Sequence, residues 1–251
     1  MKINGNTILI TGAGSGIGLA LAEEFAKLDN QVIVAVRSPD KKKAAEEKGF
    51  KTVNADMSDS ASIEALAKKV IKDFPKTNVV IHNAGIYKVE DLIKGGNSKI
   101  REETIATNLL GPMRLNDALL PHLLNQGSAT VITVSSGLAF LPKTLCPTYC
   151  ATKAGIHSYS QSLRFQLKDT TVGVIEIVPP YVQTALGGEN QATDPSAMPL
   201  KDFISEVMQI LRTNPQVEEV MVKRVYPLRY AEENGREKYD VFFKQFNEKY
   251  L

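Results

Sequence analysis

The sequence has few of the residues that mark disulfide-stabilised or metal-binding proteins. Cys146 and Cys150 are the only cysteines among 251 residues, and they stand four apart rather than in a C-x-x-C motif. Three scattered histidines add no metal-ligand spacing, so no metal site is expected. We interpret the two cysteines as small packing residues, because free cysteine commonly behaves as a small hydrophobe.

The chain also has no large excess of charge and no long hydrophobic run. Thirty basic residues oppose 28 acidic ones, a net charge of +2, which favours neither a nucleic acid nor an anionic membrane as partner. No stretch reaches the roughly 18 apolar residues that a membrane span needs, and no cleavable hydrophobic segment follows Lys2. We therefore expect a cytoplasmic protein, not bound to membranes, whose partner is a small molecule.

Short β-branched runs alternate with amphipathic stretches along the chain. The runs are nearly continuous in apolar residues, which is typical of parallel strands covered on both faces. They occupy residues 7–11, 31–37, 50–55, 78–82, 129–136 and 171–178, with helical stretches such as 15–28 and 60–74 between them. This alternation predicts an α/β fold, a single-domain doubly wound parallel sheet over residues 1–251 with ligands at the carboxyl ends of its strands.

Two segments late in the chain depart from that alternation. Residues 183 to about 200 are irregular, and a loop of this length is often a lid or a substrate loop, although a surface insertion is the alternative. Residues 226–251 carry a helical stripe made of Tyr239, Phe242, Phe243 and Phe246. This C-terminal helical extension is expected to pack on its own core, and a contact with a second copy of the chain is the alternative.

The first strand leads into a glycine-rich turn, TGAGSGIG, at residues 11–18. Glycines let a backbone approach a phosphate closely, and the start of the following helix offers unpaired N–H groups. The spacing is not G-x-G-x-x-G, because Ile17 stands where the third glycine would be, and no Gly-Lys-Ser/Thr of a P-loop is present. The turn alone favours nucleotide binding and a purely structural turn about equally.

Tyr149 and Lys153 are four residues apart, so on a helix the phenol and the ammonium share a face. About one such Y-x-x-x-K is expected by chance in a chain of this composition, so the pair alone is weak evidence. Its position is more informative, because Ser136 ends the fifth predicted strand 13 residues before Tyr149. Further upstream, the sequence TNLLG contains Asn108.

Together these motifs resemble the short-chain dehydrogenase/reductase family over roughly residues 5–225. The resemblance includes T-G-x-x-x-G-x-G from Thr11 and N-A-G at Asn83–Gly85, with His82 where the family has asparagine. It also includes PPYVQT, in which Pro180 replaces the usual glycine. The segments EIVPPYVQT, DPSAMPLKDFI and RYAEENG are similar to a narrower subgroup, the DltE-like oxidoreductases associated with lipoteichoic-acid D-alanylation operons, and extend the resemblance to the C-terminus.

The resemblance implies a Rossmann fold, a homodimer or homotetramer, and hydride transfer between a nicotinamide cofactor and a carbonyl or secondary alcohol. The catalytic residues it implies are Asn108, Ser136, Tyr149 and Lys153. The cofactor contacts expected from the resemblance, together with Ser15 and Arg37 as the contacts expected for a 2′-phosphate, are Thr11, Gly12, Ser15, Gly16, Ile17, Gly18, Arg37, Asp56, Met57, Asn83, Ala84, Gly85, Tyr149, Lys153, Pro179, Val182 and Thr184.

The second predicted strand ends in Val36-Arg37. Enzymes that select NAD place an acidic residue there to bind the ribose 2′-hydroxyl, and this chain has none. Arg37 can instead form charge-assisted bonds to a 2′-phosphate, with Ser15 as a weaker second contact. We predict that NADP(H) is preferred and that NAD(H) is possible, while an arginine simply solvated at a strand end is the alternative.

Reduction of a carbonyl needs a proton donor for the nascent alkoxide, and alcohol oxidation needs the reverse. The pKa of a free tyrosine is about 10, so Tyr149 needs the neighbouring Lys153 ammonium, and the oxidised nicotinamide, to favour its phenolate. Ser136 would hydrogen-bond the substrate oxygen. Two other functions stay open: a non-catalytic NADP(H)-binding redox sensor or scaffold, and an isomerase or dehydratase that recycles its cofactor.

Overall fold

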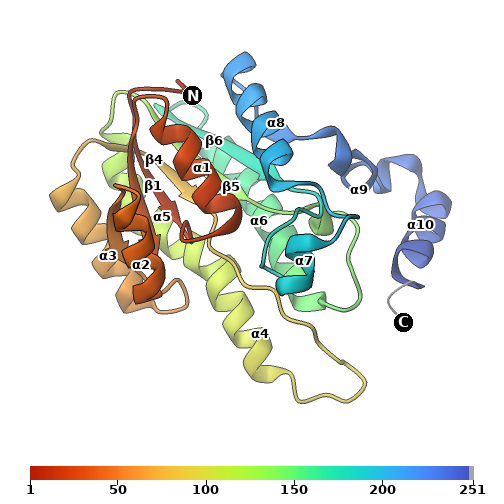
Figure 1. The fold of residues 1–251 in the computed structure, drawn as a ribbon. Helices are drawn as coiled ribbons and strands as arrows, with labels where there is room; N and C mark the ends of the chain where they lie inside the picture. The colour runs from red at the N-terminus through yellow and green to blue at the C-terminus, as the bar shows by residue number, and fades with distance from the viewer. Residues whose placement is uncertain (249–251) are drawn as a thin grey trace.

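The computed structural model describes residues 1–248. Its centre is a seven-stranded sheet in the order β3-β2-β1-β4-β5-β6-β7, and every neighbouring pair is parallel (Figure 1). The strands are β1 (Thr7–Thr11), β2 (Gln31–Val36), β3 (Lys51–Asn54), β4 (Thr77–His82), β5 (Ala129–Val134), β6 (Val172–Val178) and β7 (Glu219–Met221). The order reverses between β1 and β4, where a doubly wound sheet opens its ligand crevice.

Successive residues of each strand supply the cores on the two faces of the sheet. In β1, Ile8 and Ile10 belong to one apolar cluster, and Leu9 between them belongs to the other. All three side chains have no exposed surface. This explains why the strands read as continuous apolar runs, because in a strand covered on both faces every position is a core position.

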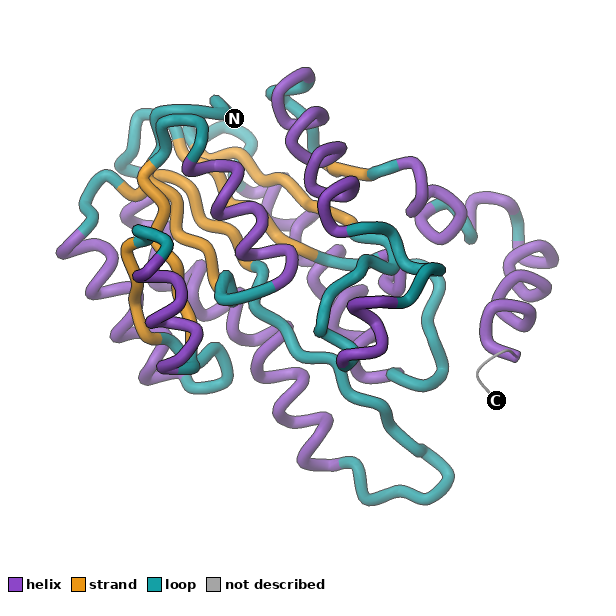
Figure 2. Tube along the Cα trace, in the orientation of Figure 1, coloured by secondary structure: helices purple, strands orange, loops and turns teal. Residues whose placement is uncertain are grey.

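Helices cover both faces (Figure 2). Phe25 of α1 and Phe203 of α8 fill the first cluster, while Leu66 of α3 and Leu119 of α5 fill the second. The helices are α1 (Gly16–Ala26), α2 (Pro39–Glu47), α3 (Ser60–Asp73), α4 (Ser98–Ile105), α5 (Gly111–Leu124), α6 (Pro147–Gln166), α7 (Glu189–Thr193), α8 (Leu200–Thr213), α9 (Tyr226–Arg229) and α10 (Arg236–Glu248). The predicted doubly wound α/β fold is thereby confirmed. No helix of residues 1–248 combines the length and apolarity that crossing a membrane requires.

The segment at 183–200 has more order than its sequence indicates. It contains the short helix α7, and a parallel bridge between Val182 and Met198 joins its two ends. Gln191 ties the loop internally, donating from Nε2 to the Val182 carbonyl at 2.8 Å. The segment is therefore an ordered loop that follows the carboxyl end of β6.

The C-terminal extension is helical to the end of the described residues, and positions 249–251 of the predicted tail lie outside them. The four aromatic side chains of its stripe are only half-buried, because α10 lies beside the sheet domain rather than on it (Figure 1). Asn247 is the buried residue of α10, accepting from the Thr144 N–H at 2.7 Å and donating to the Pro142 carbonyl at 3.1 Å. A few polar contacts thus hold α10 against the loop before α6.

Candidate active site

The carboxyl ends of β1, β4 and β5 bring the predicted motifs together. These three strands are adjacent, so the glycine turn after β1, the Asn83–Gly85 loop after β4 and Ser136 after β5 share one edge of the sheet. Neither the order of the motifs in the sequence nor their spacing requires this proximity. It follows from the strand order at the point where the sheet reverses.

Hydrogen bonds join the glycine turn to the loop after β4. Thr11 Oγ1 accepts from the Asn83 N–H at 3.2 Å and the Ala84 N–H at 3.1 Å. In return, the Asn83 side-chain amide donates to the carbonyls of Thr11 at 3.0 Å and Gly12 at 3.2 Å. Thr11 and Asn83 therefore act by holding two loops together. Their side chains have their polar groups engaged within the protein.

Replacing Gly12 with Ala is expected to lower the free energy of unfolding by about 2 to 5 kcal/mol. The left-handed backbone is strained for Ala, and the added methyl group overpacks the contact with the next loop. Gly12 has φ +67°, and an added Cβ would lie 2.6 Å from the Ala84 Cα. Gly5→Ala is the matched control, because Gly5 has φ +71° but nothing within 4 Å of an added Cβ. Urea unfolding measures both variants, and equal losses would refute the close contact at Ala84.

The start of α1 is suited to a pyrophosphate. Ser15 is its N-cap residue but makes no side-chain capping bond, and the first turn holds no acidic residue. The unpaired N–H groups and the positive end of the helix dipole therefore remain available to an anion. Gly16 faces the far side of the cleft, since a Cβ there would lie 3.5 Å from Thr184. The glycine turn and PPYVQT therefore lie against each other at the start of α1.

The loop after β4 also approaches the predicted catalytic residues. A Cβ added at Gly85 would lie 3.4 Å from Asn108 Oδ1 and 3.8 Å from Lys153 Nζ. Lys153 and Tyr149 are both buried on α6, with the Lys153 Nζ 5.6 Å from the centroid of the Tyr149 ring. The Lys153 ammonium donates to the Val134 carbonyl at 2.7 Å. The phenol and the ammonium therefore face the same way, as the i, i+4 spacing predicts.

Burial dominates the acid–base properties of this pair. It raises the pKa of Tyr149 above its ordinary value, although a hydrogen bond with Ser136 acts in the opposite direction. It lowers the pKa of Lys153 to about 8, while the charge of Glu176 opposes the fall. Burial of the Tyr149 phenol therefore opposes the lowered pKa that its spacing to Lys153 predicts.

Ser136 and Asn108 are held by local backbone features. Ser136 precedes a short 3₁₀ turn, and its Oγ accepts from the Leu138 N–H at 3.1 Å. Asn108 lies in a π-helical turn, Ala106–Leu110, between α4 and α5. Its side chain bonds both backbone groups of Ile86, accepting at 2.8 Å and donating at 2.9 Å, and so holds the chain beyond Gly85. Such π turns occur frequently at functional sites.

Basic side chains gather beside the adenosine end of the cradle. Arg37 is largely exposed and reaches Asp56 with an Nη1–Oδ2 distance of 3.5 Å. Lys41, on α2, donates to Ser15 Oγ at 3.1 Å, and its side chain lies against Gly14. Sequence reasoning missed Lys41, because only the packing of α2 against the glycine turn brings it there. Arg37, Ser15 and Lys41 thus converge on one surface.

The remaining residues predicted to contact the cofactor form hydrogen bonds or apolar contacts within the protein. Asp56 binds the backbone and hydroxyl of Ser58, and Met57 is buried under the second apolar cluster. The Pro179 carbonyl accepts from the Gly137 N–H at 2.9 Å, which ties PPYVQT to the loop of Ser136. Ile17 is half-buried and packs against the first cluster. Val182 belongs to that cluster as well as to its bridge with Met198.

His82 and the cysteines are packing residues. His82 is buried, its Nε2 lies 2.7 Å from Asn116 Oδ1, and burial lowers its pKa to about 4, so the imidazole is neutral near pH 7. This hydrogen bond joins the end of β4 to α5. Cys146 and Cys150 are free and buried, with their Sγ atoms 3.7 Å apart beside Tyr149.

Comparison with known proteins agrees with this arrangement. A family model described as short chain dehydrogenase matches residues 6–195. The chain is 38% identical to the uncharacterized oxidoreductase DltE of Bacillus subtilis (strain 168), over 98% of each chain. It is 30% identical to the NADP-dependent 3-hydroxy acid dehydrogenase of Schizosaccharomyces pombe, covering 77% of this chain and 80% of that one.

Solved structures show the same architecture. A short chain dehydrogenase from Burkholderia cenocepacia, in complex with NADP, superposes with a TM-score of 0.83 over 97% of this chain and 99% of that one, at 19% identity. An alcohol dehydrogenase from Thermococcus sibiricus, complexed with 5-hydroxy-NADP, has a TM-score of 0.76 at 26% identity, covering 88% and 97% of the two chains.

Proposed function

The chain belongs to the short-chain dehydrogenase/reductase family, and on that premise we propose that it is an NADP(H)-dependent oxidoreductase acting on a carbonyl or a secondary alcohol. One observation carries the proposal. Ser136, Tyr149 and Lys153 lie at the same sheet edge as an uncapped helix start and a glycine turn. A dinucleotide held by that turn would therefore extend toward the phenol.

When bound, the nicotinamide would supply or accept the hydride. Ser136 would hold the substrate oxygen by a hydrogen bond, and Tyr149 would donate or remove the proton on that oxygen. The Lys153 ammonium would bind the ribose of the cofactor and keep a positive charge beside the phenol. Asn108 would anchor a water that connects Lys153 with solvent. The burial of the pair gives these charges a low-dielectric surrounding, in which they act strongly.

The preference for NADP(H) is supported by the charges at the end of β2. Arg37 pairs with a partly exposed carboxylate, and such surface pairs contribute about 0 to 1 kcal/mol. The guanidinium can therefore turn to a 2′-phosphate at little cost. We assign Lys41 to the same phosphate, since its ammonium already lies beside Ser15. The relative from S. pombe and the two solved structures carry NADP in their names.

A homodimer or homotetramer in the cytoplasm is part of the same proposal. Large apolar side chains, Ile105, Leu110 and Phe165, are exposed along α4, the π turn and α6. Contacts between protein chains commonly bury exposed apolar side chains, so these three are the candidates for such a contact. The substrate itself is a small molecule, and no charged surface suggests a nucleic acid.

NADPH absorbance, followed against a panel of aldehydes, ketones and diketones, tests the proposed function. We expect stoichiometric NADPH consumption with at least one class of carbonyl. Tight NADPH binding without consumption across the panel would favour the redox sensor or scaffold. Product formation without net consumption would favour an isomerase or dehydratase. Each outcome separates one function from the other two.

A further inference from the structure

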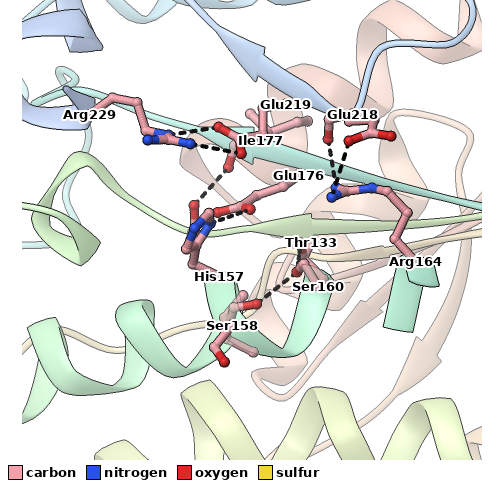
Figure 3. Close-up of polar contacts among 12 residues, drawn as sticks. Thr133, His157, Ser158, Ser160, Arg164, Glu176, Ile177, Glu218, Glu219 and Arg229 are labelled. Atoms are coloured by element: carbon pink, nitrogen blue, oxygen red, sulfur yellow. Dashed lines mark hydrogen bonds and ion pairs between the residues drawn. The ribbon is translucent and has the colours of Figure 1, made fainter. Parts of the chain in front are cut away.

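A fully buried carboxylate, that of Glu176, faces α6, the helix that carries Lys153. Glu176 sits in the middle of β6, paired with Thr133 of β5 and Glu219 of β7, and has no exposed surface. Its Oε2 forms a hydrogen bond with His157 Nδ1 at 2.8 Å (Figure 3). Its Oε1 has no hydrogen-bond partner among the described residues. A buried carboxylate costs several kcal/mol in desolvation, so this position needs an explanation.

His157 belongs to the same helix face as the catalytic pair. Tyr149, Lys153 and His157 follow one another at intervals of four residues on α6. The face that presents the phenol and the ammonium to the cleft therefore continues one turn further to the bond with Glu176. His157 also stacks edge-on against Phe140, with ring centroids 4.6 Å apart. The imidazole is thereby held against β6.

Cationic groups near Glu176 are engaged elsewhere. Arg229 of α9 donates to both oxygens of Glu219, at 2.7 and 3.0 Å, and its guanidinium lies 4.5 Å from the Phe140 ring centroid. Arg164 of α6 pairs with Glu218 at 3.6 Å (Figure 3). Although His157, Glu176 and Glu219 could approach one cation, Arg229 already neutralises Glu219. Among the described residues, no lysine or arginine forms an ion pair with Glu176, and His157 is its side-chain hydrogen-bond partner.

Lys153 is likewise a buried charged group without an ion-pair partner among the described residues. Its ammonium is buried and donates to a backbone carbonyl, and within the described part of the chain no carboxylate lies in ion-pair range of it. The titratable groups on the elements nearest to it are Tyr149 and His157 on its own helix, Glu176 on β6, and the Glu219–Arg229 pair next to Glu176. Among these, Glu176 is the buried negative charge without its own guanidinium.

We propose that Glu176 is a positioning residue that supplies the counter-charge for Lys153, held in place by His157 and shielded from solvent by the Glu219–Arg229 pair. This inference rests on the proposed function, because it concerns the charge state of its lysine. Burial alone lowers the pKa of Lys153, and the negative charge of Glu176 raises it. Without that charge, the ammonium would lose its proton at a lower pH.

The test is Glu176→Gln, which keeps the shape and a hydrogen bond to His157 but removes the charge. Lys153 is followed by NMR of protein labelled with ¹³C at lysine Cε, and its signal is assigned as the one missing from Lys153→Arg. We expect the Lys153 pKa to fall by about one unit or more, as for loss of a nearby opposite charge. The alkaline limit of kcat/KM should move to lower pH by the same amount.

Glu218→Gln is the matched control, because Glu218 lies beside Glu176, its backbone carbonyl accepting from the Glu176 N–H at 2.8 Å, while its largely exposed side chain loses the same charge. It should leave the Lys153 titration unchanged. Glu176→Met, similar in volume and without polar groups, serves if the Gln variant fails to fold, and the same shift is expected. An unchanged Lys153 pKa in a folded Glu176 variant would overturn the proposal. The NMR titration needs no turnover, so this result is separate from a failure of the proposed oxidoreductase activity.

Discussion

Tyr149→Phe is expected to lower kcat by about 10²- to 10⁴-fold, the usual contribution of a positioned general acid or base. NADPH affinity should stay close to that of the parent. The phenyl ring keeps the packing of the tyrosine, including an edge contact with Tyr87 at a centroid distance of 5.2 Å and the approach of Lys153. Only the proton-exchanging hydroxyl and its bond with Ser136 are lost.

Turnover of the variant is measured with the best carbonyl substrate from the panel, and NADPH binding by fluorescence titration. Tyr87→Phe is the matched control, since Tyr87 is the neighbouring tyrosine in the same small cluster and we assign it no proton transfer. It should keep most of the parent kcat. If Tyr149→Phe retained turnover near the parent rate, Tyr149 would have no role in proton transfer.

Tyr149 and Lys153 also indicate which groups must lower the pKa of the phenol during the reaction. Burial raises the pKa of Tyr149, and the ammonium 5.6 Å from its ring does not reverse that effect. A phenol that exchanges protons near neutral pH therefore needs a further positive charge or a hydrogen bond present only in the complex. The oxidised nicotinamide and the substrate oxygen on Ser136 are the groups that would provide them.

The strands and the placement of Tyr149 beside Lys153 could be predicted from the sequence, because both depend on local patterns. A strand buried on two faces must be apolar at nearly every position, so β1, β2 and β4 appear as continuous runs. Tyr149 and Lys153 lie together because one helix carries both. The six predicted strands agree with the structure to within a residue or two at most ends.

Features that depend on tertiary contacts could not be predicted. β7 has only three residues, too few for a periodic signal, and forms because β6 offers an edge. Glu176 is the one charged residue in the run 171–178, and nothing in the sequence indicates what it contacts. Lys41 and the π turn at Asn108 gain their roles from α2 and from the loop after β4, respectively.

Arg37→Ala and Lys41→Ala are each expected to weaken NADPH binding by roughly 10- to 150-fold, which corresponds to about 1.5 to 3 kcal/mol for a hydrogen bond to a charged group. NADH affinity should remain unchanged, because NADH has no 2′-phosphate for either cation. Lys42→Ala is the matched control. Lys42 is the next residue on α2 and pairs with Glu46 at 3.8 Å. Its replacement by Ala removes the same charge from the helix.

Dissociation constants for NADPH and NADH, measured for all three variants at one salt concentration, separate the two roles that Arg37 and Lys41 can play. A loss confined to NADPH identifies a phosphate contact, because only that ligand carries the extra charge. An equal loss for both cofactors would mean that the Lys41–Ser15 bond supports the turn itself. Parent protein that bound NADH as tightly as NADPH would remove Arg37 from cofactor selection altogether, since its exposed pair with Asp56 would then be its only contact.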